Sequence, residues 1–81
     1  MVYVLLAEGF EEVEALAPVD VLRRAGIQVM TAGVGGDVIS GAHSINVICD
    51  TEVQDIAEEN VEGIILPGGM QLHAFTSLPR Q

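Results

Sequence analysis

The sequence predicts the opening half of a doubly wound α/β sandwich, in which helices cover both faces of a parallel sheet. Short runs are apolar at consecutive positions, as in strands buried on both faces. Segments typical of a strand, a helix and a strand follow one another in residues 2–32, which is the order of a βαβ unit. The chain has 81 residues, of which 49% are hydrophobic. So short a chain encloses little interior, and we therefore expect part of a larger domain.

The βαβ unit is the best-defined part of the prediction. The run "VYVLLA" (2–7) predicts the first strand. Residues 11–25 have helical periodicity and stop before Gly26, a residue suited to the left-handed conformation that follows a helix. The run "IQVMTA" (27–32) predicts the second strand. A crossover through one helix makes the two strands parallel.

The elements after residue 32 are shorter. The pieces "DVIS" and "SINVIC" in residues 37–49 predict an edge hairpin. The stretch "DTEVQDIAEEN" (50–60) predicts a short amphipathic helix that begins at Asp50 or Thr51. The run "IILP" (64–67) predicts a third parallel strand. Three strands with one or two helices leave parts of the sheet uncovered, so we expect more chain or a partner to cover them.

Charge and cysteine content exclude several classes of partner. Twelve Asp and Glu residues oppose three arginines, for a formal net charge of −9. This charge repels nucleic acids and anionic membranes. The apolar run 2–7 is too short for a membrane span and has no basic residues before it, so we expect neither a signal peptide nor a membrane segment. Cys49 is the single cysteine and cannot form an internal disulfide, which favours a cytoplasmic location.

The stretch "EGFEEVE" holds four glutamates, and a helical projection at 100° per residue separates them. Glu12 falls among the charged residues of the helix and is predicted to face solvent. Glu11 lies in the first turn, where a carboxylate meets unpaired N–H groups. Glu8 belongs to the preceding loop. Glu14, by contrast, projects from the centre of the apolar side.

A carboxylate on the apolar side needs an explanation, because its burial is costly unless it is hydrogen-bonded, paired or protonated. Glu14 is therefore either a structural group bonded to loop amides or a general acid–base residue. Pro18 lacks the N–H that would bond to the Glu14 carbonyl, so either the helix kinks there or Pro18 begins it after a separate turn at residues 10–16. Both arrangements place Glu14 near the carboxyl end of the first strand, where open α/β sheets bind ligands.

Two glycine-rich segments follow predicted strands. Gly68 and Gly69 in "LPGG" either form a tight turn or bring backbone N–H groups close to a reacting atom, as an oxyanion hole requires. The segment "GVGG" (33–36) fits no phosphate-binding pattern, and we interpret it as a turn.

The remaining candidates have simpler interpretations. Cys49 ends an apolar strand and has no cation nearby in sequence, as expected of a small buried residue. His43 and His73 lack the spacing of a metal site, and no metal site is predicted. Val13 and Leu16 fall on the charged side of the helix, where they are either ordinary exposed residues or a contact with another subunit.

Taken together, "VLLAEGFEEVEALAPVDVLRRAG", "VICD" and "IILPGG" resemble the amino-terminal portion of the ThiJ/PfpI family, the DJ-1 superfamily, over residues 2–69. This resemblance implies a class I glutamine amidotransferase-like, flavodoxin-like three-layer sandwich that is usually dimeric, needs no cofactor and carries a cysteine nucleophile on a strand-to-helix elbow. It implies that Glu14 hydrogen-bonds the nucleophilic thiol and that Gly68 and Gly69 donate backbone N–H groups to an oxyanion. Cys49 matches a second, non-catalytic cysteine near the dimer interface of some members.

The nucleophile implied by the resemblance belongs after residue 69, and residues 70–81 depart from the family pattern without supplying it. We therefore expect residues 1–81 to be a partial domain, from a truncated or frame-altered reading or a cut piece, and to be inactive alone. The whole protein is expected to be a hydrolase or lyase acting on small reactive dicarbonyls or their adducts, glyoxalase-like or deglycase-like. A redox sensor or chaperone-like stress protein, or a peptidase or amidase, is the alternative.

Overall fold

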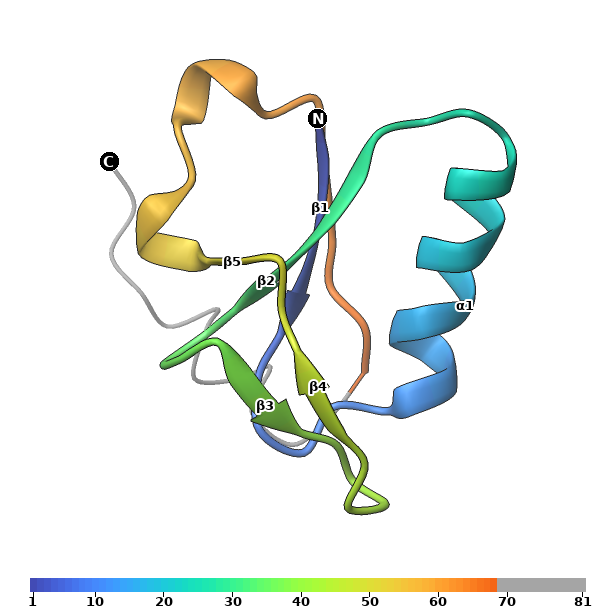
Figure 1. The fold of residues 1–81 in the computed structure, drawn as a ribbon, viewed down its shortest axis with the longest axis vertical. Helices are drawn as coiled ribbons and strands as arrows, with labels where there is room; N and C mark the ends of the chain where they lie inside the picture. The colour runs from blue at the N-terminus through green and yellow to red at the C-terminus, as the bar shows by residue number, and fades with distance from the viewer. Residues whose placement is uncertain (69–81) are drawn as a thin grey trace.

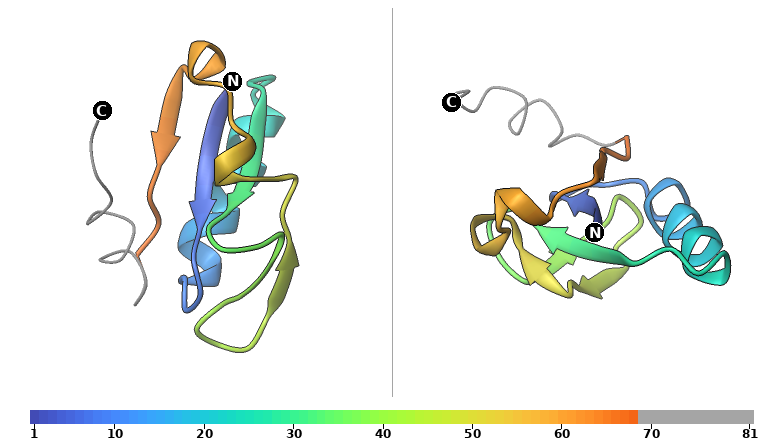
Figure 2. Two further views of the ribbon diagram at one scale, coloured as in Figure 1. Left: turned by 90° about the vertical axis from the view of Figure 1, so that its left-hand side faces the viewer. Right: turned by 90° about the horizontal axis from the view of Figure 1, so that it is seen from above.

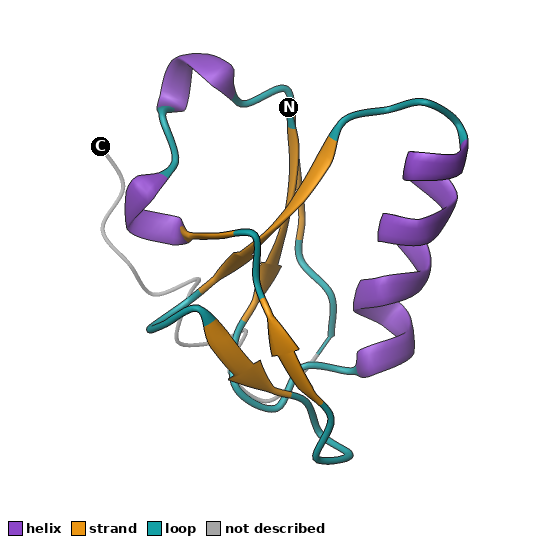
Figure 3. Cartoon of the chain, in the orientation of Figure 1, coloured by secondary structure: helices purple, strands orange, loops and turns teal. Residues whose placement is uncertain are grey.

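The computed structural model describes residues 1–68, and it shows a parallel sheet with one long helix and a separate hairpin (Figures 1 and 3). The sheet has four strands in the order β5-β2-β1-β6, and β3 pairs with β4 in a second sheet. The strands and the helix are β1 (Val2–Leu6), α1 (Glu12–Arg24), β2 (Val29–Gly33), β3 (Val38–Ser40), β4 (Asn46–Ile48), β5 (Thr51–Glu52) and β6 (Gly63–Ile65). Two single 3-10 turns, η1 (Val53–Asp55) and η2 (Glu58–Asn60), connect β5 to β6.

The strand pairing confirms the predicted βαβ unit. β1 and β2 are parallel, from the pair Val2 and Val29 to the pair Leu6 and Gly33. β6 lies parallel on the other side of β1, and β3 and β4 form the predicted antiparallel hairpin. The carboxyl ends of β1 and β6 therefore lie at the same edge of the sheet, next to the start of α1 (Figure 2).

Each face of the sheet has its own apolar core, because successive side chains of β1 point to opposite faces. One core joins β1 and β2 to α1 and the hairpin, and it includes Val4, Leu6, Phe10, Ala15, Val19, Val29, Ile39 and Cys49. The other lies under the η1 and η2 segment and is built from Tyr3, Leu5 and Ala32, with Val53, Ile56 and Val61 packed against them. β1 is therefore covered on both faces, as its uninterrupted apolar run predicts.

The predicted helix at residues 50–60 is wrong. Thr51 pairs with Ala32 in β5, so this residue extends the sheet and does not begin a helix. The Asp50 carboxylate accepts hydrogen bonds from Thr31 and Arg23 and is therefore not used as a cap. Neither 3-10 turn has a side-chain cap, and each ends after three residues. Backbone pairing at the sheet edge is the tertiary contact that outweighs the local helical pattern.

Helix α1 is continuous through Pro18, so the alternative in which Pro18 begins the helix after a separate turn is wrong. The helix ends as predicted. Gly26 has a φ of +82°, the left-handed region that glycine adopts without strain, and its N–H donates to the Arg23 carbonyl at 3.0 Å. Within residues 1–68, no helix is long and apolar enough to cross a membrane.

The β6 side of the sheet is less covered than β1. Ile64 and Leu66 are 51% and 41% exposed. These apolar side chains agree with the expectation that further chain or a partner covers the sheet.

Candidate functional site

Glu12 and Glu14 occupy the opposite environments to those predicted. Glu12 is buried, with 8% of its surface exposed, whereas Glu14 is exposed. The projection of an isolated helix fails here because the hairpin lies over the first turn of α1 and covers Glu12. The burial of Glu12 depends on where residues 40–45 lie in the fold, and the sequence of the helix alone carries no information about their position.

The structure nevertheless brings Glu14 and Gly68 together, so Glu14 bonds to a loop amide as its structural interpretation expects, although it does so on the surface. The Gly68 N–H donates to Glu14 Oε1 at 3.1 Å, and the Glu11 N–H donates to the Gly68 carbonyl at 2.8 Å. The backbone N–H and carbonyl of Gly68 therefore both bind the first turn of α1. A Cβ atom at Gly68 would lie 2.6 Å from Glu14 Oε1, so a larger residue here would displace the end of the Glu14 side chain and weaken this contact. The pair lies at the carboxyl edge of the sheet, where open α/β folds place their ligands.

In this arrangement the Gly68 N–H is already hydrogen-bonded. It donates to a carboxylate in the structure, so it would have to exchange Glu14 for another acceptor before it could stabilise an oxyanion. The exposed Glu14 carboxylate is suited to exchange a proton with a group placed beside it. Gly69 and His73 lie outside the described residues, as does the predicted departure of residues 70–81 from the family pattern.

Glu12 is the centre of a hydrogen-bond cluster that sequence analysis missed. Its Oε2 accepts the His43 N–H at 2.7 Å and the Ile45 N–H at 3.4 Å, and its Oε1 lies 2.9 Å from His43 Nδ1. The hydrogen bond to the His43 side chain lowers the pKa of Glu12 to about 2; burial opposes this shift, and the backbone N–H groups support it. Glu12 is therefore an ionised structural anchor at neutral pH. A contact between residues 31 positions apart leaves no local signal in one sequence.

His43 takes part in the same cluster from the hairpin. The hydrogen bond with Glu12 raises the pKa of His43, and the negative charges of Glu12 and Glu11 add to the shift. Ligand atoms of Glu11, Glu12 and His43 lie within 4.8 Å of one another, which is close enough for a metal site. However, both Glu12 oxygens already face nitrogen atoms of the hairpin, so the arrangement is better described as an ion pair with hydrogen bonds.

Cys49 lies in the core on the α1 side of the sheet, as its apolar context predicts. It is 6% exposed, and its N–H donates to the Asp37 carbonyl at 2.7 Å. Burial raises the pKa of the Cys49 thiol, and the negative charge of Asp50 adds to this effect. A thiol of this kind is poorly suited to nucleophilic or redox chemistry, because the reactive species is the thiolate.

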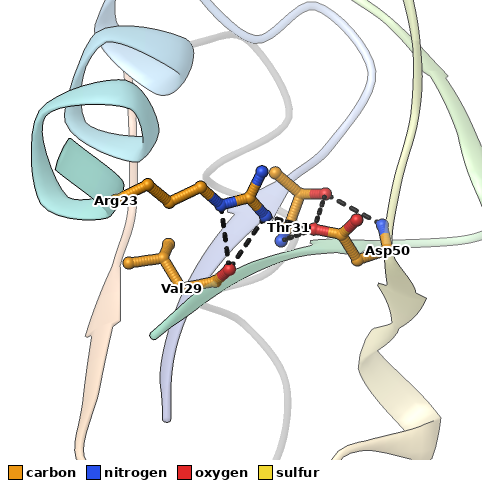
Figure 4. Close-up of polar contacts among 4 residues, drawn as sticks. All are labelled: Arg23, Val29, Thr31 and Asp50. Atoms are coloured by element: carbon orange, nitrogen blue, oxygen red, sulfur yellow. Dashed lines mark hydrogen bonds and ion pairs between the residues drawn. The ribbon is translucent and has the colours of Figure 1, made fainter. Parts of the chain in front are cut away.

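A second carboxylate cluster lies at the other end of α1 (Figure 4). Asp50 Oδ2 accepts the Thr31 N–H and an Arg23 Nη2–H, both at 2.9 Å. The same guanidinium donates to the Val29 carbonyl at 2.8 Å. Partial burial opposes ionisation of Asp50, but the hydrogen bonds from Thr31 and Arg23 outweigh burial and lower its pKa. This cluster ties the helix end to the edge of β2.

Comparison with known proteins identifies the family. The sequence model of the DJ-1/PfpI family matches residues 1–79. The chain belongs to the DJ-1/PfpI family. Protein dj-1beta of Drosophila melanogaster is 40% identical over 68 residues, which cover 83% of this chain and 36% of that protein. A deglycase of Pyrococcus abyssi is 32% identical over 68 residues, covering 84% of this chain and 41% of that protein.

Solved structures of the DJ-1 superfamily have the same fold. The crystal structure of Drosophila melanogaster DJ-1beta matches with a TM-score of 0.86 at 34% identity. The match covers 95% of this chain and 42% of that chain. A DJ-1 superfamily protein of Salmonella typhimurium has a TM-score of 0.80 at 37% identity, covering 86% of this chain and 38% of that chain. The predicted α/β class is therefore confirmed, and the chain spans about two fifths of the length of these relatives.

Proposed function

We propose that the whole protein to which this chain belongs is a cofactor-independent cysteine hydrolase or lyase that acts on small reactive dicarbonyls or their adducts, in the manner of a glyoxalase or a deglycase. The observation that supports this proposal most is the contact between the exposed Glu14 carboxylate and Gly68 at the carboxyl edge of the sheet. Membership of a family that includes a protein named as a deglycase supports it further.

The chemistry assigns one task to each group. A cysteine from outside residues 1–81 forms a sulfur–carbon bond with the substrate carbonyl, and the carbonyl π electrons move to the oxygen, which then takes up a proton. Glu14 holds or transfers the proton of the thiol. Gly69, and Gly68 once it exchanges Glu14 for the substrate, donate N–H groups to the oxyanion. Because residues 1–81 contain no such nucleophile, we propose that they are inactive alone.

The test is the substitution Glu14→Gln in the whole protein, with methylglyoxal as substrate. We expect kcat to fall by about 10²-fold, the range for loss of a general acid–base group, while KM changes little. Glu8→Gln is the matched control, since Glu8 is also an exposed glutamate beside α1 but bonds to the Ser40 N–H. Full activity in Glu14→Gln would remove Glu14 from the mechanism. An absence of turnover in the wild-type protein would instead favour the peptidase or amidase alternative.

The redox-sensor alternative has less support from the described residues. Cys49 is buried, and burial raises the pKa of its thiol, so a sensing role would have to use another cysteine of the whole protein. An oxidation-dependent change in partner binding without dicarbonyl turnover would favour this alternative.

We also propose that the whole protein is a cytoplasmic homodimer. Apolar side chains are strongly exposed on the first turn of α1 and on the hairpin, with Val13 at 72%, Val38 at 53% and Ile48 at 77%. Val38 and Ile48 are directly paired across β3 and β4, so they form one apolar surface. Surfaces of this kind are typical of contacts between subunits.

A further inference from the structure

We propose that Glu12 is a positioning residue of the Glu14 site: by binding the hairpin, its carboxylate fixes the first turn of α1 in the orientation that places Glu14 against Gly68. The effect on turnover rests on the proposed function. The structural coupling between Glu12 and the Glu14–Gly68 contact does not.

The hairpin and the strand-to-helix loop are joined by consecutive hydrogen bonds that end at Glu12. The Gly9 N–H donates to the Ser40 carbonyl, and the Ala42 N–H donates to the Phe10 carbonyl, both at 2.8 Å. Phe10 and Gly41 form a parallel bridge between these two bonds. The next bonds in this direction are those from the His43 and Ile45 N–H groups to the Glu12 carboxylate. Glu12 therefore carries the connection from the loop into the helix.

The opposite side of the same turn is held by Gly68, through the Glu11 N–H and the Glu14 carboxylate. Residues two positions apart in an α-helix are separated by about 200° around its axis, so Glu12 and Glu14 project from nearly opposite sides. A rotation of the first turn that released Glu12 from the hairpin would also move Glu14 away from Gly68. Together, the two contacts thus fix one orientation of the first turn of α1.

The helix start has no side-chain cap that could replace Glu12. Glu11 occupies the N-cap position, and its side chain makes no capping hydrogen bond. The space around Glu12 is also narrow, because a Cβ atom at Gly41 would clash with the Glu12 carboxylate. Both observations indicate that the position of the first turn depends on the Glu12 carboxylate and on the absence of a side chain at residue 41.

The test compares Glu12→Ala with Glu8→Ala in the whole protein, because a glutamine at residue 12 would keep an oxygen able to accept the His43 and Ile45 N–H groups. Glu8 also accepts a hairpin N–H, that of Ser40 at 3.1 Å, but it lies before the helix and is exposed. We expect Glu12→Ala to lower kcat for methylglyoxal by about tenfold and to change KM by less than about twofold, since a misplacement of a reacting group by about 1 Å can cost about 10²-fold in rate. Glu8→Ala should leave both constants close to wild type.

Amide hydrogen exchange separates positioning from general stability and from catalysis. In Glu12→Ala, the Gly68 amide should exchange about tenfold faster because its bond to Glu14 opens more often, and it should accelerate by a larger factor than the amide of Val4 in β1, which reports the loss of overall stability. Equal acceleration at both amides, or none at Gly68, would overturn the proposal. This measurement remains decisive if the wild-type protein does not turn over methylglyoxal, an outcome that would refute the proposed function instead.

Gly41→Ala provides a second perturbation that keeps the carboxylate. Its added methyl group must displace Glu12, so the variant should reproduce the faster exchange at Gly68. In the double variant Glu12→Ala with Gly41→Ala, the methyl group meets no carboxylate, so the two effects should be non-additive. Additive effects on Gly68 exchange would show that Gly41 acts independently of Glu12 and would contradict the mechanism.

Discussion

The two ends of α1 are each anchored by a carboxylate, but the two anchors differ in their contact with water. At the amino-terminal end, the Glu12 side chain is 9% exposed beneath the hairpin, and that of its partner His43 is 72% exposed. At the carboxyl-terminal end, the Asp50 side chain is 39% exposed, and that of its partner Arg23 is 50% exposed. The Glu12 carboxylate is less accessible to water than the Asp50 carboxylate. The buried anchor should therefore carry more of the stability.

Both anchors also suit the helix electrostatically. The ionised Glu12 lies in the first turn, near the positive end of the helix dipole, and Arg23 lies in the last turn, near the negative end. The difference between the ends consequently comes from burial and from the number of bound backbone N–H groups. It does not come from an unfavourable charge at either end.

The largest effect is expected from Glu12→Ala. This substitution leaves the His43 and Ile45 N–H groups without their acceptor beneath the hairpin. We expect the thermal unfolding midpoint of the whole protein to fall by roughly 5 °C or more, which differential scanning calorimetry can measure. A decrease smaller than that of Asp50→Ala would contradict the comparison between the two anchors.

A smaller effect is expected from Asp50→Ala. The lost bonds come from Thr31 and Arg23, and water can replace the bond from the half-exposed Arg23, so we expect a loss of about 1 kcal/mol in the free energy of unfolding. Urea titration measures this loss. Arg23→Lys is the matched control, because a lysine keeps the charge but cannot donate to both the Val29 carbonyl and Asp50 with the planar fork of a guanidinium. Its loss should be smaller than that of Asp50→Ala.

The smallest effect concerns pH. The pKa of Glu12 is lowered from 4.5 to about 2, so its contribution to stability is complete above pH 4.5 and is lost as the pH falls toward 2. The pKa of His43 is raised from 6.5, so its contribution is complete below pH 6.5 and is lost as the pH rises through the raised value. The Glu12 anchor should therefore be strongest between about pH 4.5 and 6.5.

A comparison of variants assigns this pH effect. The Asp50 anchor contains no histidine, and the pKa of Asp50 is lowered, so it should weaken only in acid. His43→Ala should abolish the loss of stability between neutral and alkaline pH, as measured by urea titration at several pH values. Persistence of that loss in His43→Ala would show that another group causes it.

Sequence periodicity was sufficient for the parts of the fold that are buried on a regular pattern. The strands β1, β2 and β6, the hairpin and the helix α1 follow from apolar runs, turn residues and the glycine after the helix. It failed at residues 50–60 because pairing of Thr51 with β2 outweighs a local helical pattern. The helical projection also predicted the wrong environments for Glu12 and Glu14, because the segments that cover a helix face can be distant in sequence.

The candidate site was predicted in part. The contact of Glu14 with Gly68 agrees with the positions expected from the order of the strands, although Glu14 is exposed. The Glu12 cluster could not be predicted because its donors come from the hairpin, whose position over α1 is set by packing of Ile39 and Phe10 in the core.

The burial of Cys49 also makes this residue a reporter. It is the single sulfhydryl in the 81-residue sequence, and its surroundings in the core protect it from alkylating reagents while the hairpin stays in place. The rate at which a reagent such as iodoacetamide modifies Cys49 therefore measures how often this part of the core opens. Mass spectrometry can follow this modification without an introduced label, so the rate at which the hairpin moves away from the core becomes measurable.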